Sequence, residues 1–167
     1  MPYRNAPETI DVLGKTVISE VILAITDTGA AHANGDLVGT DNTPFTFHNC
    51  AAENGGSGKV IGAVLVDWDL QSVAGDLWLF DHAPLGLPAD NAAITITDAS
   101  AKYFIGLIPF DTYYATALNS VSVGTPTSPL AFKCEATSND LYGFFVTRGA
   151  PTYTTLFPFF RLYITQD

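Results

Sequence analysis

Residues 58–98, which read GKVIGAVLVDWDLQSVAGDLWLFDHAPLGLPADNAAITITD, decide the fold class of this chain. Two short apolar runs, residues 60–68 and 77–80, are separated by a polar loop, and a third run at residues 93–97 alternates between apolar and polar side chains. Each run predicts a β-strand. In the first run both alternate sets are apolar, with Ile61, Ala63 and Leu65 on one side and Val60, Val64, Val66 and Trp68 on the other. Such a strand is expected to be covered on both faces, by a second sheet or by a neighbouring subunit.

Similar short runs recur about every dozen residues along the rest of the chain, separated by turn-forming residues. They predict strands at residues 16–26, 37–39, 44–50, 108–110, 113–123, 130–136, 141–147 and 156–165. We expect the loop at residues 53–58 to close a hairpin between the strands at 44–50 and 60–68. Residues 98–106 predict one helix of about two turns, with Asp98 as its cap and Gly106 at its end.

The pattern therefore predicts an all-β protein: an antiparallel β-sandwich or jelly-roll-like fold with about eight to ten short strands and one short helix. We expect an extended N-terminal arm at residues 1–15, where Pro2, Pro7 and Gly14 interrupt a segment with few apolar side chains. Residues 16–167 are expected to form a single β-sandwich domain. A chain of 167 residues can bury roughly two-thirds of its unfolded surface in one domain.

The composition indicates what kind of partner the surface of the protein can bind. Hydrophobic residues make up 47% of the chain and charged residues 14%, against about 25% charged residues in an average globular protein. So few charges predict a chain that buries surface against other copies or partners, with a thick self-contained core as the alternative. The formal net charge of −10 argues against direct binding to nucleic acid or to an anionic membrane.

The two cysteines, Cys50 and Cys134, do not form a disulfide framework at this chain length, and we expect two buried free thiols, with a single bridge as the alternative. The first residues contain no apolar signal-peptide core, and no apolar run approaches the roughly 18 residues that a membrane span needs. The expectation is a soluble protein made in the cytosol.

No pattern in the sequence predicts a catalytic residue or a cofactor. His32, His48 and His82 stand in turns or strands, away from any nucleophile motif. Acidic and imidazole groups around the central strands are the candidate ligands for a hard cation, namely Asp67, Asp69, Asp76, Asp81, His82 and Asp90. Their spacing matches no known calcium motif, and loops are where aspartate is common, so we expect no metal site. The glycine-rich residues 55–58 predict a flexible turn.

Aromatic residues are the candidate contact residues. The chain has 11 Phe, 7 Tyr and 2 Trp, and because Phe lacks a polar group for a wet binding face, a core or a subunit interface is favoured over a sugar-binding platform. The candidate interface residues are Tyr3, Tyr113, Tyr114, Phe157, Phe159 and Phe160.

Four segments in the same order resemble a family of small virion proteins of tailed bacteriophages. They are Ala33-Asn34-Gly35-Asp36-Leu37-Val38-Gly39; residues 55–61 (GGSGKVI); residues 77–81 (LWLFD) with residues 90–98 (DNAAITITD); and residues 141–154 (LYGFFVTRGAPTYT) with Gln166-Asp167. Together they span about residues 33–167. The N-terminal part of this chain and its Phe-rich segment at 156–160 depart from the family pattern.

The resemblance implies a non-enzymatic virion structural protein, and in particular a capsid decoration (cement) protein on the outer surface of the head, made in the host cytoplasm. Its implied partners are the major capsid protein and other copies of itself, for which a trimer would suit a local threefold axis of the shell. The arm at residues 1–15 or the aromatic end is expected to reach a neighbouring subunit. No cofactor and no catalytic residue come with the resemblance.

Two other classes of function remain as alternatives. One is a tail, baseplate or fibre-adaptor component that shares the fold and is present in few copies. The other is a glycan-binding surface module, which the Trp and Tyr content permits.

Overall fold

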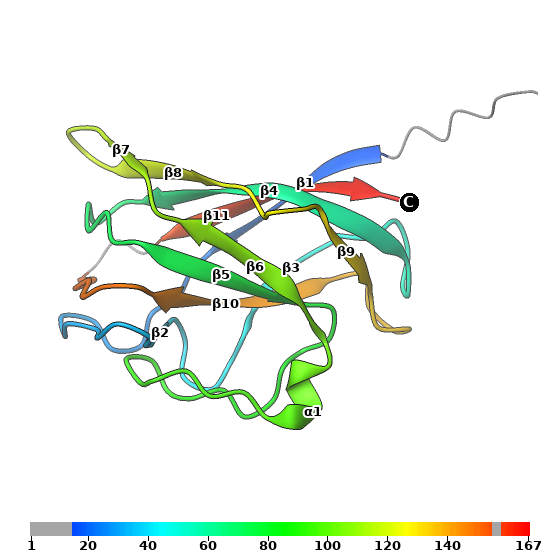
Figure 1. Cartoon of the computed structure of the whole chain (residues 1–167), viewed down its shortest axis with the longest axis horizontal. Coiled ribbons are helices and arrows are strands. Elements are labelled where there is room, and N and C mark those ends of the chain that lie inside the picture. Colours follow the sequence, from blue (N-terminus) through cyan, green and yellow to red (C-terminus); the bar gives the residue numbers. More distant parts are fainter. Residues whose placement is uncertain (1–14, 155–157) are drawn as a thin grey trace, which may run out of the picture.

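Two antiparallel β-sheets lie face to face in this computed structural model, which describes residues 15–154 and 158–167 (Figure 1). The six-stranded sheet has the order β1 (Lys15–Ile22), β11 (Phe159–Gln166), β4 (Ser57–Asp67), β8 (Ser120–Gly124) and β7 (Tyr113–Ala115), with β9 (Leu130–Lys133) also paired to β4. The five-stranded sheet has the order β2 (Leu37–Val38), β10 (Leu141–Thr147), β5 (Gly75–Phe80) and β6 (Phe104–Phe110), with β3 (Phe45–Phe47) also paired to β10. The prediction of an all-β sandwich with one short helix is confirmed.

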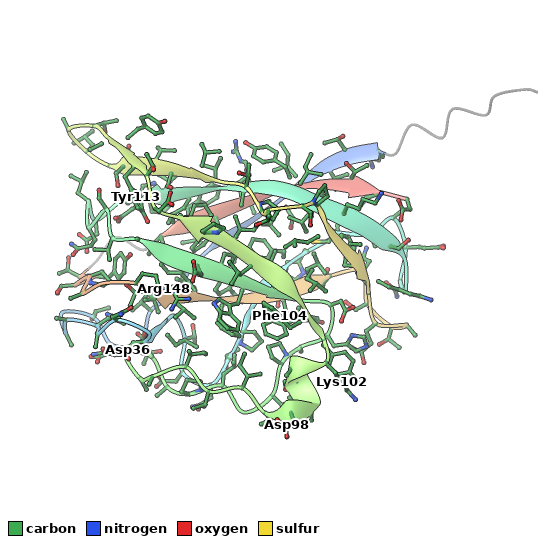
Figure 2. All side chains as sticks on the ribbon, in the orientation of Figure 1. Asp36, Asp98, Lys102, Phe104, Tyr113 and Arg148 are labelled. Atoms are coloured by element: carbon green, nitrogen blue, oxygen red, sulfur yellow. The ribbon has the colours of Figure 1, made fainter. Side chains whose placement is uncertain are left out.

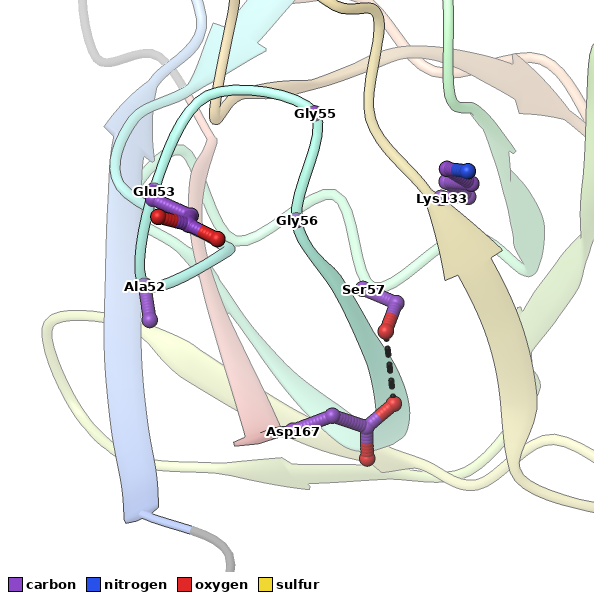
Figure 3. Close-up of a pocket in the computed structure, with 7 residues that line it drawn as sticks. All are labelled: Ala52, Glu53, Gly55, Gly56, Ser57, Lys133 and Asp167. Atoms are coloured by element: carbon purple, nitrogen blue, oxygen red, sulfur yellow. Dashed lines mark hydrogen bonds between the residues drawn. The ribbon is translucent and has the colours of Figure 1, made fainter.

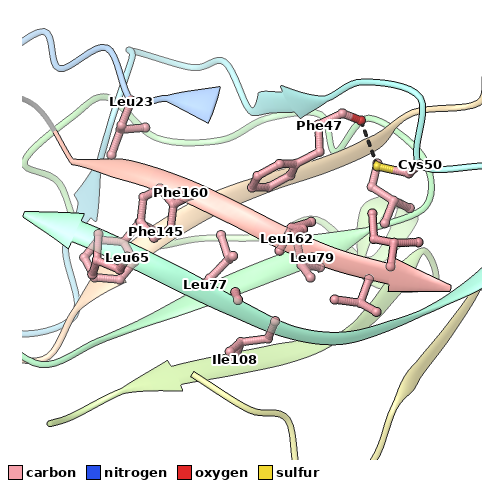
Figure 4. Packing of buried hydrophobic residues seen from close by; sticks show 14 of the residues in the cluster. Leu23, Phe47, Cys50, Leu65, Leu77, Leu79, Ile108, Phe145, Phe160 and Leu162 are labelled. Carbon is pink, nitrogen blue, oxygen red and sulfur yellow. Dashed lines mark hydrogen bonds between the residues drawn. The ribbon is translucent and has the colours of Figure 1, made fainter. Parts of the chain in front are cut away.

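The main core lies between the two sheets and is built from the inward residue of each alternating pair (Figure 4). From β11 it receives Phe160, Leu162 and Ile164, and from the five-stranded sheet it receives Leu77 and Phe145, all fully or almost fully buried. The rings of Phe145 and Phe160 lie 5.3 Å apart between their centroids. Burial of each such side chain contributes about 1.5–3 kcal/mol, so this layer supplies much of the stability of the sandwich.

A β-bulge in β4 changes which of its side chains face the core. Tyr163 of β11 pairs with Gly62, and the next residue, Ile164, pairs with Val60, so Ile61 has no partner in the ladder. The extra residue reverses the alternation. Val60 therefore faces the core together with Ala63 and Leu65, while Ile61 is exposed. The predicted grouping of Ile61 with Ala63 and Leu65, and of Val60 with Val64 and Val66, was wrong, because a period of two cannot reveal an inserted residue.

The five-stranded sheet has its outer side covered by residues 81–103, which we call the cover segment. Outward side chains of the sheet, including Phe80, Phe144 and Val146, form a second buried cluster with Leu37 and with Leu87 of the cover segment. Ile94, Ile96 and Tyr103 pack against this cluster. Figure 1 shows the cover segment and α1 (Asp98–Ala101) beneath the five-stranded sheet.

The cover segment contains the two largest errors of the sequence prediction. Residues 93–97 are not a strand, since Ala93 forms only an isolated bridge with Asp36. Ile94 and Ile96, which are two residues apart, instead pack against the outer side of the five-stranded sheet. The helix has one turn, because β6 begins at Phe104 and includes Gly106. Its N-cap is Thr97, whose hydroxyl accepts a hydrogen bond from the Ser100 backbone N–H at 3.2 Å.

The loop at residues 53–58 does not close a hairpin. β3 pairs with β10 in the five-stranded sheet, whereas β4 belongs to the six-stranded sheet, so the loop carries the chain from one sheet to the other. Gly55 takes φ +71° in this crossing, a conformation that glycine adopts without strain. The predicted arm at residues 1–15 lies outside the described residues except for Lys15, which begins β1.

Candidate functional site

One row of apolar side chains crosses the outer side of the six-stranded sheet from edge to edge. The pairing register places Ile22 of β1 beside Phe159 of β11, Phe159 beside Val66 of β4, Val66 beside Val121 of β8, and Val121 beside Tyr114 of β7. Ile22 is 58% exposed and Tyr114 is 67% exposed. The indole of Trp68 stacks on the ring of Phe159, with the centroids 6.0 Å apart.

A second row beside it carries the one ion pair of this side of the sheet among the described residues. Glu20, Arg161, Val64 and Val123 are aligned by register on β1, β11, β4 and β8. The Arg161 Nε donates to Glu20 Oε1 at 2.7 Å, and this hydrogen bond raises the pKa of the guanidinium above its usual value. Both side chains are solvent-accessible, so the pair is worth little to stability and leaves the row nearly neutral.

Ile18 and Tyr163 form a third row, which Ile61 extends at the bulge. We call this outward side of β1, β11, β4, β8 and β7 the bare face. No described segment lies over it, in contrast to the five-stranded sheet with its cover segment (Figure 1). An uncovered apolar surface of this extent is typical of a site that binds another protein.

The structure divides the candidate interface residues. Tyr114 and Phe159 lie on the bare face. Phe160 is 0% exposed and belongs to the core, which removes it from the candidates. The Tyr113 hydroxyl donates to the Val73 carbonyl at 2.7 Å, its ring packs against the core, and burial raises the pKa of its phenol. Figure 2 shows Tyr113 on β7, near the edge of the sheet. The remaining two candidates, Tyr3 and Phe157, lie outside the described residues.

Asp90 is the most connected polar group of the described chain. Its carboxylate accepts hydrogen bonds from the backbone N–H groups of Thr26, Asp27 and Gly39 at 2.7–3.0 Å, and it lies 3.0 Å from His32 Nε2. Burial acts to raise its pKa, but the hydrogen bonds from His32 and from the backbone outweigh burial and hold the pKa below the ordinary value. These bonds tie the cover segment to the loops at residues 24–41, which is a structural role.

Other acidic residues of the candidate cation set are held apart in separate loops. Asp67 accepts from the backbone N–H groups of Asp69 and Ser72, and burial raises its pKa. The Asp76 carboxylate pairs with the guanidinium of Arg148, which Figure 2 labels just after β10. Asp81 lies 2.8 Å from its neighbour His82. Within residues 15–154 and 158–167, no three His, Cys, Asp or Glu side chains come together as metal ligands.

The two cysteines are free and buried. Cys50 Sγ donates to the Phe47 carbonyl at 3.1 Å, as Figure 4 shows. Burial raises the pKa of Cys50 to about 12 and that of Cys134 to about 11. A nucleophilic cysteine needs a lowered pKa, so both thiols are protonated packing groups at neutral pH.

A pocket of about 480 Å³ opens beside the glycine-rich loop (Figure 3). Ser57 Oγ donates to Asp167 Oδ2 across it at 2.8 Å. Its lining residues are Ala52, Glu53, Gly55, Gly56, Ser57, Lys133 and Asp167. None of them is aromatic, so the pocket lacks the ring surface on which a sugar stacks.

Fold and surface together define this chain as an all-β sandwich domain with one apolar sheet face left uncovered by its described residues. Comparison with protein-family models, with curated proteins and with solved structures found no match. None of the described helices is long and apolar enough to cross a membrane. Of the residues on the bare face, the sequence prediction named Tyr114 and Phe159. Arg161 and Tyr163, the other bare-face residues of β11 in these rows, could have been found from the strict alternation of residues 159–166, which separates them from the core residues between them.

Proposed function

We propose that this chain is a non-enzymatic structural protein of a tailed-bacteriophage virion, which decorates the outer surface of the assembled head and stabilises it. The observation that carries the proposal is the bare face. A sandwich that leaves an apolar sheet face uncovered is suited to function within an assembly, where other protein surfaces bury that face.

The segments that resemble small phage virion proteins support this proposal by where they lie. Gly35 donates to the Thr147 carbonyl of β10 at 2.8 Å, and Ile94 of the cover segment donates to the Gly35 carbonyl at 3.1 Å. Leu37 donates to the Ala92 carbonyl at 3.0 Å. Three of the four resembling segments therefore meet at one place, where they join the cover segment to the five-stranded sheet. The resemblance concerns a scaffold and does not assemble a reactive centre.

The physical basis of decoration is linkage. A protein that binds the assembled shell, and not its dissociated subunits, stabilises the shell by an amount that rises with the ratio of its free concentration to its dissociation constant. A shell offers many equivalent sites, so contacts that are individually small add up when the bound copies also contact one another.

The number of copies per particle tests the proposal. Particles of the phage that encodes this chain are purified and the chain is quantified by gel densitometry against the major capsid protein. We expect a copy number comparable to that of the capsid protein. A dozen copies or fewer would instead indicate a tail, baseplate or fibre-adaptor component. Absence from particles would overturn the proposal, and a glycan array would then test the third class of function.

A further inference from the structure

The two outer sides of the sandwich present similar side chains to very different surroundings. On the five-stranded sheet, Phe144 and Val146 point outward and are almost fully buried by the cover segment. On the six-stranded sheet, the outward Val64 and Val66 of β4 are half-buried and the outward Val123 of β8 is 62% exposed. Since exposed apolar surface is costly in water, the bare face is suited to burial by a partner, and none of the described residues of this chain covers it.

The distribution of charge indicates which kind of chain can bind the bare face. The whole protein has 17 acidic and 7 basic residues. Among the outward side chains of β1, β11, β4, β8 and β7, the charged ones are Glu20, Arg161 and Lys59, one acid against two bases. Two copies that met through any strongly acidic part of the surface would repel each other. At the bare face this repulsion is smallest, because Glu20 is neutralised by Arg161 within the same chain.

The size of the face is sufficient for such a contact. Five neighbouring strands spaced about 4.8 Å apart, with 8, 8, 11, 5 and 3 residues at about 3.3 Å per residue, cover roughly 550 Å². Two copies would bury about 1,100 Å² in total, which exceeds the roughly 1,000 Å² expected of a biological interface. Twisted sheets pack face to face readily, as the two sheets within this chain already do.

We propose that the bare face binds the bare face of a second copy, so that two chains form a two-fold dimer with their six-stranded sheets packed together. A two-fold contact requires a patch that is complementary to itself, and a nearly neutral apolar sheet face satisfies this requirement. The dimer is a property of the chain itself and does not depend on the proposed virion function. The capsid would then be met by a preformed pair of copies.

Sedimentation velocity of the purified full chain over a micromolar concentration series tests this proposal. The unsubstituted chain is expected to sediment as a dimer. A double variant, Ile22→Glu with Val123→Glu, places carboxylates at two exposed positions of the bare face. It is expected to raise the dissociation constant of the dimer by roughly 100-fold or more, because each buried carboxylate would lack a partner.

The matched control is Leu85→Glu, which changes a side chain of the cover segment that is 74% exposed. This variant is expected to remain dimeric. Circular dichroism verifies that all variants keep their β-structure. A monomeric unsubstituted chain, a trimer, or a dimer that survives the double substitution would each overturn the proposal. Because no capsid is present in the experiment, its failure would leave the copy-number test of the proposed function unaffected.

Discussion

The two outer sides of this sandwich differ in how the chain treats an apolar sheet face. The five-stranded sheet receives 23 residues of cover, from residue 81 to residue 103, which contribute Leu87, Ile94 and Ile96 to a second core. The six-stranded sheet carries a comparable apolar row and receives no cover from the described residues. The comparison shows that the same alternating sequence pattern can produce either a sheet face buried within the chain or a sheet face available to a partner. What decides between them is whether another segment of the chain returns across the sheet.

Two phenylalanines on opposite outer sides give the largest expected difference. Phe144→Ala removes a ring that is 1% exposed beneath the cover segment and should lower the free energy of unfolding by about 3–5 kcal/mol. Phe159→Ala removes a half-buried ring of the bare face that contacts Trp68 and should cost about 1–2 kcal/mol. Urea unfolding measures both, in the Val123→Glu background so that dimer formation does not contribute. Equal losses of unfolding free energy at the two positions would contradict the distinction between a covered and an uncovered sheet face.

The second prediction concerns Asp90, which attaches the cover segment to the loops beside it. Asp90→Asn weakens the hydrogen bonds that tie the cover segment to the loops at residues 24–41, and it should lower the free energy of unfolding at neutral pH by about 2–3 kcal/mol. The folded pKa of Asp90 is depressed, so the stabilisation by its carboxylate is present above the ordinary carboxyl pKa. It is lost as the pH falls through the ordinary value toward the lowered folded one.

The difference between Asp90 and the Asn variant should therefore shrink between neutral pH and about pH 3, as followed by urea unfolding at each pH. Asp98→Asn is the control, since Asp98 is an exposed carboxylate in the same cover segment. That variant should change stability by no more than about 0.5 kcal/mol. If the difference in unfolding free energy between the unsubstituted chain and Asp90→Asn stayed constant with pH, the hydrogen bonds of Asp90 could not be the cause of its lowered pKa.

The smallest effect on the isolated fold is expected on the bare face. Val123→Glu changes an exposed position, so the monomer should lose at most about 0.5 kcal/mol. Its consequence should appear instead in how the melting temperature depends on protein concentration. The melting temperature of the unsubstituted chain should rise with concentration, because dimer formation stabilises the folded state, while that of the variant should not. A melting temperature that does not depend on concentration in either protein would count against dimer formation through the bare face.

The sequence predicted the elements whose pattern is local. β10 is apolar on both sides, and the structure buries both, one in the main core and one under the cover segment. Partners in the sheet were not predictable in the same way. The loop at residues 53–58 has the composition of a hairpin turn, yet β3 finds its partner in β10, about 100 residues along the chain.

Of the candidate interface residues, Tyr114 and Phe159 lie on the bare face, and the sequence indicated them only as members of two aromatic groups. Phe160 was wrongly grouped with its neighbour, although the period of two assigns adjacent residues to opposite sides. The aliphatic members, such as Ile22 and Val121, could not be recognised from sequence. Their exposure follows from the absence of a covering segment among the described residues, which only the tertiary structure reveals.

Cross-linking through an introduced cysteine at the centre of the bare face tests the central claim most directly. β4 is the middle strand of the face, so a two-fold axis through the interface passes close to Val64. The native thiols are both buried, which leaves the cysteine of a Val64→Cys variant as the accessible one. We predict that a short bis-maleimide links two copies of Val64→Cys and does not link two copies of Leu85→Cys. Efficient linkage of Leu85→Cys, with none for Val64→Cys, would show that the copies meet through the covered side and would contradict this account.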